Sequence, residues 1–254
     1  MNKKIIFFIL LIVIPVGIYY HTNTLMTTHY QLKLSESKRT LKIAHISDLH
    51  SHHFGELEKQ LIASLKKEKP DLIVITGDLT TPKRDRDYSY LLRNLHAPLG
   101  VYFILGNWEY WAPINHLDEL LANAHITNLT NKFQKISEDL WLVGFDDSRE
   151  GNPDLKVMNT IPSTSFKIGL FHSPQFFDKI AGKINLGLAG HSHGGQLRIP
   201  FIGEIWTPEG TGPYVQGWYY QKNSHLFVSR GIGTSVLPVR FNCSPELAMI
   251  HIVY

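Results

Sequence analysis

The segment LKIAHISDLH, residues 41–50, is an apolar run that ends in the polar sequence Ser-Asp-Leu-His. Two later segments repeat this arrangement, LIVITGD at residues 72–78 and VYFILGN at residues 101–107. Each apolar run predicts a buried strand, and a helical pattern follows each one. The predicted helices cover residues 56–69, 88–95 and 114–124. This alternation predicts an α/β fold, in which sites form where the strands end at their carboxyl edge.

The rest of the chain is mostly β-rich. Further strands are expected at residues 29–34, 140–145, 166–171, 186–189, 196–199, 226–229 and 247–253, with one helix at 175–181. Because helices are concentrated in the first half, we expect two sheets packed together with helices outside them. Residues 201–220 are rich in glycine, proline and aromatic residues and are expected to form a long loop.

Two of these later strands also end in histidine. Residues 166–171 are followed by His172, and residues 186–189 are followed by Gly-His-Ser-His. Taken singly, each strand end has an ordinary interpretation as a turn, a helix cap or a surface histidine. Five such ends in one chain instead predict a metal site. Its expected ligands are Asp48, His50, Asp78, Asn107, His172, His191 and His193.

These residue types suit phosphoryl chemistry. Two metal ions about 3.5–4 Å apart need a shared ligand, and a carboxylate can bind both. Neutral imidazole and amide oxygen complete the coordination without adding negative charge that would repel phosphate. Such a pair of ions activates water, so no nucleophilic side chain is required. The sequence therefore predicts a hydrolase of a phosphoric ester or anhydride, with Gly77, Gly106 and Gly190 allowing the sharp turns before the ligands.

The composition excludes several other classes. The 254 residues carry a net charge of +3 and no block of Lys or Arg, so no nucleic-acid partner is expected. The single cysteine, Cys243, excludes an internal disulfide framework and a cysteine-based zinc site. The size fits one large domain, which we place at residues 27–254.

The N-terminus predicts a membrane segment over residues 1–26. Lys3 and Lys4 precede a run from Ile5 to Tyr20 with no charged or amide side chain. A tilted helix extending to Met26 would span the hydrocarbon core. A cleaved signal peptide is the alternative, although no Ala-x-Ala-like site follows. An uncleaved segment predicts a single pass through a bacterial inner membrane. In either case the positive-inside rule predicts an extracytoplasmic catalytic domain.

The motifs Asp-x-His, Gly-Asp, Gly-Asn, His and Gly-His-x-His resemble those of the calcineurin-like metallophosphoesterase superfamily, over nearly all of the chain after residue 40. The segments GHSHGGQ and RGIGTSVLPVRFNCSPE are similar to its bacterial membrane-associated branch, which includes the YkuE- and YaeI-type phosphodiesterases. The resemblance implies a four-layer α/β/β/α sandwich and two divalent ions, Mn²⁺, Zn²⁺ or Fe²⁺. It implies one ion on Asp48, His50, Asp78 and His193, and the other on Asp78, Asn107, His172 and His191.

One residue departs from the family pattern. Where Gly-Asn-His-Asp/Glu is usual, this chain has Gly-Asn-Trp-Glu, so Trp108 replaces the histidine that acts as a general acid. An indole N–H donates a hydrogen bond but is not a usable acid. Two interpretations stay open: the site lacks an acid, or Trp108 only packs and His52 or His53 supplies the proton. Asp78, Asn107, His52 and His53 are the expected catalytic residues, and Glu109 is expected to brace the loop.

The expected function is hydrolysis of a phosphodiester or pyrophosphate, with a lipid-linked or envelope substrate as one option. A narrower alternative is the UDP-2,3-diacylglucosamine pyrophosphatase of lipid A synthesis, but its substrate lies on the cytoplasmic face. A non-catalytic binding scaffold on the same fold is the alternative from another class. Such a scaffold would have lost ligands, whereas this chain keeps all seven.

Overall fold

The computed structural model describes residues 3–36, 39–51, 54–79 and 88–254, with side chains from residue 13 onward. These residues form two six-stranded sheets and one short two-stranded ribbon. The first sheet has the order β1 (Met26–Lys33), β14 (Glu246–Val253), β2 (Thr40–Ile46), β3 (Leu72–Thr76), β4 (Val101–Ile104) and β5 (Ile126–Asn128). The second has the order β12 (Gly217–Gln221), β13 (Ser224–Val228), β9 (Leu186–Ala189), β8 (Phe166–Leu170), β7 (Leu140–Gly144) and β6 (Lys132–Lys135).

The centre of each sheet is parallel. Strands β2, β3, β4 and β5 run in one direction, as do β7, β8, β9 and β13 in the other sheet. Antiparallel pairing occurs between β14 and β2, between β12 and β13, and between β6 and β7. Parallel strands end at one edge of their sheet, so each sheet presents several loops at its carboxyl edge.

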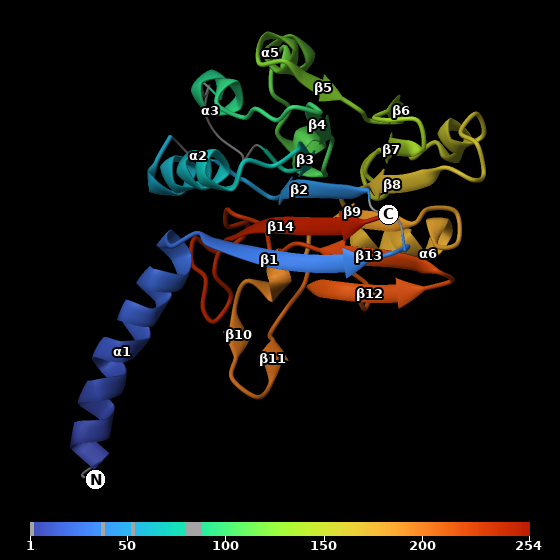
Figure 1. Ribbon diagram of the computed structural model, residues 1–254. Coiled ribbons are helices and arrows are strands. Elements are labelled where there is room, and N and C mark those ends of the chain that lie inside the picture. Colours follow the sequence, from blue (N-terminus) through green and yellow to red (C-terminus); the bar gives the residue numbers. More distant parts are fainter. Residues whose placement is uncertain (1–2, 37–38, 52–53, 80–87) are drawn as a thin grey trace.

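Three hydrophobic clusters show how the layers pack. One lies between the first sheet and the helices α2 (Glu56–Glu68), α3 (Ser89–Arg93) and α5 (Leu117–Asn123), which cover the outer face in Figure 1. The second joins the facing sides of the two sheets through residues such as Ile43, Val74, Leu142 and Leu188. The third lies between the second sheet and the segment η2 (Pro174–Phe176) with α6 (Phe177–Ile180). The predicted α/β class is confirmed, with helical segments outside two packed sheets.

Residues 201–220 differ from the predicted long loop. They contain β11 (Gly203–Glu204), which pairs with β10 (Arg198–Ile199), and most of β12. Strand β12 folds back on β13 around Lys222 and Asn223, whose φ angles are 50° and 61°. A two-residue hairpin turn of this kind requires positive φ at both residues. The sequence Lys-Asn predicts such a turn only weakly. The predicted helix at 175–181 is likewise divided into η2 and α6.

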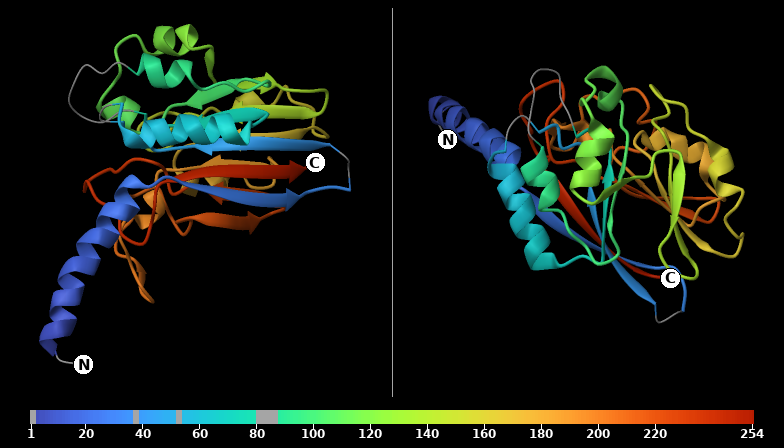
Figure 2. Two further views of the ribbon diagram at one scale, coloured as in Figure 1. Left: turned by 60° about the vertical axis from the view of Figure 1, so that its left-hand side comes forward. Right: turned by 90° about the horizontal axis from the view of Figure 1, so that it is seen from above.

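Two features project from the same side of the sheets, as Figures 1 and 2 show: helix α1 (Lys3–Asn23) and the hairpin of β10 and β11. The last turns of α1 pack on the body formed by the two sheets and their loops, where His21 Nδ1 lies 2.8 Å from Ser244 Oγ and the Arg240 N–H donates to Thr22 Oγ1. Across the described residues, no helix has both the length and the apolar character that crossing a bilayer requires.

Candidate metal centre

Loops after five strands of the two sheets bring all seven predicted ligand side chains together. The loops follow β2, β3 and β4 in the first sheet and β8 and β9 in the second. Every one of these side chains belongs to a buried residue, although all seven are polar: Asp48, His50, Asp78, Asn107, His172, His191 and His193. Burying so many polar groups costs free energy unless they interact with one another or with a bound ligand. Their common burial therefore indicates a binding site.

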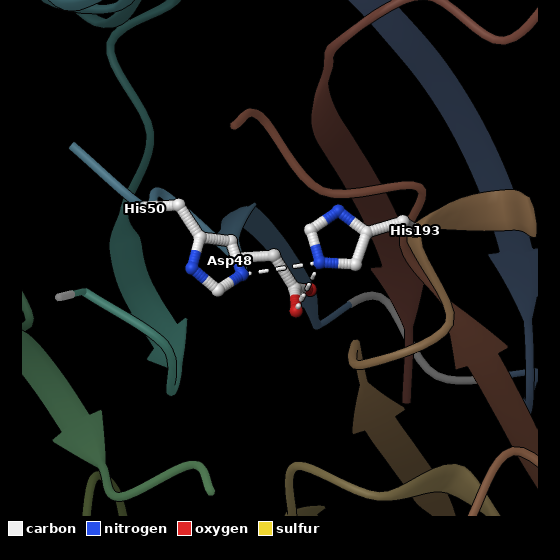
Figure 3. A group of neighbouring side chains, drawn as sticks. All are labelled: Asp48, His50 and His193. Carbon is white, nitrogen blue, oxygen red and sulfur yellow. Dashed lines mark hydrogen bonds and ion pairs between the residues drawn. The ribbon is translucent and has the colours of Figure 1, made fainter. Parts of the chain in front are cut away.

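Asp48, His50 and His193 form the first group (Figure 3), in which one ligand atom from each residue lies within 4.8 Å of the others. The Nε2 atoms of the two histidines are 3.1 Å apart. His193 Nε2 lies 3.5 Å from Asp48 Oδ1. Two imidazole nitrogens and a carboxylate oxygen thus point at a common centre.

Asp78, His172 and His191 form the second group under the same 4.8 Å limit. His172 Nε2 lies 3.2 Å from Asp78 Oδ2 and 3.1 Å from His191 Nδ1. The amide oxygen of Asn107 joins this group, 3.0 Å from His172 Nε2 and 2.9 Å from His191 Nδ1. Four donor atoms therefore surround a second centre.

Asp78 links the two groups. Its Oδ2 atom is 3.2 Å from His172 Nε2 in the second group and 3.5 Å from His50 Nε2 in the first. Its other oxygen, Oδ1, accepts the backbone N–H of Trp108 at 2.9 Å, which fixes the orientation of the carboxylate. One oxygen is thus placed to serve both centres, as a bridging carboxylate must.

Hydrogen bonds behind two histidines determine which nitrogen faces the centre. His172 Nδ1 lies 2.7 Å from the carbonyl oxygen of Thr76, and His191 Nε2 lies 2.8 Å from that of Glu209. A carbonyl only accepts, so each of these ring nitrogens carries the proton. The opposite nitrogen of each ring then presents a lone pair to the centre, which is the tautomer that metal binding needs.

The backbone at the site is strained. Five of the ligands have positive φ angles, between 40° and 68°: Asp48, His50, Asp78, His191 and His193. Non-glycine residues rarely adopt this region, and such strain concentrates at functional sites. Two glycines allow the close approach of the loops. A Cβ atom at Gly106 would collide with the Asp78 carboxylate, and one at Gly190 would collide with Ser47 and Asp48.

Glu109 braces two of the loops, as the sequence predicts. Its carboxylate accepts the backbone N–H groups of Asp78, Leu79 and Gly106, at 2.9, 2.8 and 2.7 Å. The residue is buried, and three N–H donors satisfy its charge. It therefore holds the β3 and β4 loops in the arrangement that brings Asp78 and Asn107 together.

Burial and neighbouring charge shift the pKa values in the site. Burial raises the pKa of Asp78 to about 7, although the nearby His172 acts to lower it. Burial also lowers the pKa of His191 to about 4 and, together with His50, holds the pKa of His193 well below its usual value. Burial acts to lower the pKa of His172, but the charge and hydrogen bond of Asp78, together with the charges of Asp48 and Asp147, raise it well above its usual value. A divalent cation would reverse the effect on Asp78 by favouring its ionised form.

The ligand groups face a cavity of about 310 Å³. Trp108 lines this cavity, and its ring meets the His50 ring edge-on at 5.5 Å between centroids. Arg149 is the only Lys or Arg among the described lining residues, and its Nη1 lies 3.0 Å from Glu209 Oε2. Sequence reasoning missed Arg149, because it follows β7 without a motif. The two histidines proposed as the acid, His52 and His53, lie outside the described residues.

The donor set fits divalent metal ions. Each group offers imidazole nitrogen and carboxylate oxygen, and Asn107 adds an amide oxygen to the second group. This combination suits Mn²⁺, Fe²⁺ or Zn²⁺. The Nε2 atoms of His50 and His193 lie 3.1 Å apart, close enough for both to bind one cation when neither carries a proton. The arrangement can hold two adjacent ions in a buried pocket that opens to a cavity.

Comparison with known proteins identifies the family of this chain. The family model described as calcineurin-like phosphoesterase matches residues 41–195. The uncharacterized metallophosphoesterase YkuE of Bacillus subtilis (strain 168) is 33% identical over 247 residues, covering 91% of this chain and 86% of that protein. The phosphodiesterase YaeI of Escherichia coli (strain K12) is 31% identical, covering 84% and 82%. The protein TT1561 of Thermus thermophilus aligns in structure with a TM-score of 0.49 at 14% identity, covering 76% and 90%. The chain therefore belongs to the calcineurin-like phosphoesterase family and is a hydrolase of phosphoric esters.

Proposed function

We propose that this protein hydrolyses a phosphodiester or a pyrophosphate with two divalent metal ions. The position of Asp78 Oδ2 between the two ligand groups carries the proposal. One ion would be held by Asp48, His50, Asp78 and His193, and the other by Asp78, Asn107, His172 and His191. When bound, two such ions polarise phosphoryl oxygens and lower the pKa of water.

The residues around the ligands orient the substrate. The guanidinium of Arg149 reaches the same cavity as the ligand groups and is suited to bind a phosphoryl oxygen in two-point fashion. Trp108 forms part of the cavity wall beside His50. Its indole cannot deliver a proton, so substrates whose leaving group is weakly basic are favoured. A phosphoanhydride and an activated diester both meet this requirement.

We place the enzyme at a bacterial inner membrane, anchored by its N-terminal segment with the catalytic domain on the extracytoplasmic side. Lys3 and Lys4 before the apolar run support this orientation. The contacts of His21 and Thr22 with Ser244 and Arg240 attach the end of α1 to the catalytic domain. The scaffold alternative finds no support, since all seven ligands are present and converge.

Replacement of the bridging carboxylate tests the proposal. Asp78→Asn keeps the size of the side chain but removes the charge that both ions need, so we expect loss of at least one metal ion and of hydrolysis. Metal content and turnover of bis(p-nitrophenyl) phosphate are the measurements, with circular dichroism as the check on folding. Asp118→Asn, at an exposed position of α5, is the matched control and should keep both. Two bound ions and full turnover in Asp78→Asn would refute the assignment.

A further inference from the structure

A second cavity, of about 340 Å³, adjoins the metal-ligand cavity. The two share five lining residues: His193, Trp206, Pro208, Ser235 and Val236. One of these, His193, belongs to the first ligand group. The two cavities therefore lie next to each other, and the same five side chains border both.

The second cavity is apolar. Its walls beyond the shared residues include Leu197, Ile205 and Leu237, and none of its described lining residues is Asp, Glu, Lys or Arg. Ile205 and Leu237 are 61% and 49% exposed, so apolar surface here lies open to water. Covering that surface with hydrocarbon is favourable, whereas a sugar or a nucleotide base would find few hydrogen-bond partners.

The hairpin of β10 and β11 leads from this cavity to the side on which α1 projects (Figure 1). Leu197 directly precedes β10 and Ile205 directly follows β11, so the base of the hairpin forms part of the cavity wall. Phe201 and Ile202, at its turn, are exposed. Apolar residues thus occupy the base and the turn of the hairpin, on either side of the Arg198–Glu204 ion pair, and the turn lies on the side of the proposed membrane.

We propose that the second cavity binds the hydrocarbon chain of the substrate, so that the phosphoester cleaved at the ligand groups belongs to a lipid-like amphiphile. This inference rests on the proposed function for the location of the phosphoryl group. In this arrangement the phosphoryl group lies at the two ligand groups, beside Arg149. The hydrocarbon chain of the substrate passes Trp206 and Val236 into the space bounded by Leu197, Ile205 and Leu237.

A series of p-nitrophenyl alkyl phosphodiesters tests it, because the leaving group stays constant while the chain grows from methyl to octyl. With the full-length protein in non-ionic detergent, kcat/KM should rise by about fourfold for each methylene that the cavity fully buries. Ile205→Gln/Leu237→Gln should lower the octyl-to-methyl ratio of kcat/KM by at least about tenfold. Leu99→Gln/Phe133→Gln, at exposed apolar positions elsewhere, is the matched control and should keep the wild-type ratio.

Partitioning into micelles affects all three proteins equally, so the difference between the two double variants is decisive. A wild-type ratio near one would overturn the inference, and so would an unchanged ratio in Ile205→Gln/Leu237→Gln. In both cases hydrolysis of the methyl ester would leave the proposed function intact.

Binding of alkylphosphonates tests the apolar subsite independently of hydrolysis. Calorimetry with methyl- to octylphosphonate on the metal-loaded protein should show affinity that increases with chain length in wild type and control. The increase should be lost in Ile205→Gln/Leu237→Gln. Chain-dependent binding without hydrolysis of any ester would refute the proposed function alone. Equal affinity along the series would refute the apolar subsite.

Discussion

The Nε2 atoms of His50 and His193 lie 3.1 Å apart, although the two residues are 143 positions apart in the chain. Their rings are nearly stacked, at 22° between planes, and both are buried. His50 follows a strand of the first sheet and His193 a strand of the second. A cation held between them would therefore connect the loops of the two sheets.

Metal binding should consequently stabilise the fold. An ion at about 100 times its Kd contributes about 2.7 kcal/mol per site. For a chain of this size that corresponds to a rise in Tm of roughly 5–10 °C. Differential scanning calorimetry with chelator and then with Mn²⁺, Zn²⁺ or Fe²⁺ measures the shift. His193→Ala should reduce it, whereas His116→Ala, at an exposed position outside the cluster, should not. An identical Tm with chelator and with every metal would contradict the predicted centre.

Replacing Trp108 by histidine should restore an acid beside the leaving group. Trp108→His is then expected to raise turnover of alkyl esters, whose leaving groups are strongly basic, more than that of p-nitrophenyl esters. The measurement is the slope of log kcat against leaving-group pKa for each protein. Trp108→Phe is the control, because it changes the packing without adding an acid.

The alternative acid is tested with the same plot. If His52 or His53 supplies the proton, its replacement by alanine should selectively slow the alkyl esters and steepen the slope. A wild-type slope near zero that Trp108→His, His52→Ala and His53→Ala all leave flat would show that proton delivery does not limit the reaction. The interpretation of Trp108 as a functional departure would then be wrong.

His45 should make the protein sensitive to acid. Burial lowers the pKa of His45 to about 3, and its Nδ1 has no hydrogen-bond partner among the described residues. Because the unfolded chain takes up this proton near pH 6.5, stability is fully present above that pH and falls as the pH decreases toward 3. Urea unfolding in chelator should show a loss of about 1.4 kcal/mol per pH unit from this residue. His45→Gln should remove that contribution, and the exposed His116→Gln should retain it.

The orientation in the membrane gives a direct test of localisation. A reporter fused after Tyr254 should behave as extracytoplasmic, and the protein should stay with membranes after a high-salt wash. A cytoplasmic signal would reverse the topology inferred from Lys3 and Lys4. It would also promote the UDP-2,3-diacylglucosamine pyrophosphatase alternative, whose substrate lies on that face.

The sequence by itself determined the α/β class, the main strands and the identity of the seven polar residues that converge. Strand β3 and strand β9 have the predicted bounds, because short, fully buried β-rich runs leave little choice of secondary structure. The ligands could be found because each one lies within a few residues of the end of such a strand. Where local signals were weak, prediction failed: β12 lies in the expected loop, and its pairing depends on the positive φ angles at Lys222 and Asn223.

The family resemblance implied how the ligands divide into two groups, but only the tertiary structure decided the contacts that form these groups and the cavities they face. The pairing of His50 with His193 and the bridging position of Asp78 depend on how two sheets pack, and no local pattern encodes that packing. Arg149 reaches the site from an irregular segment after β7, and the apolar cavity joins residues from the β10–β11 region to Val236 and Leu237. Such contacts form when surfaces from distant parts of the chain are buried against each other. Their free energy is therefore distributed over residues that are far apart in the sequence.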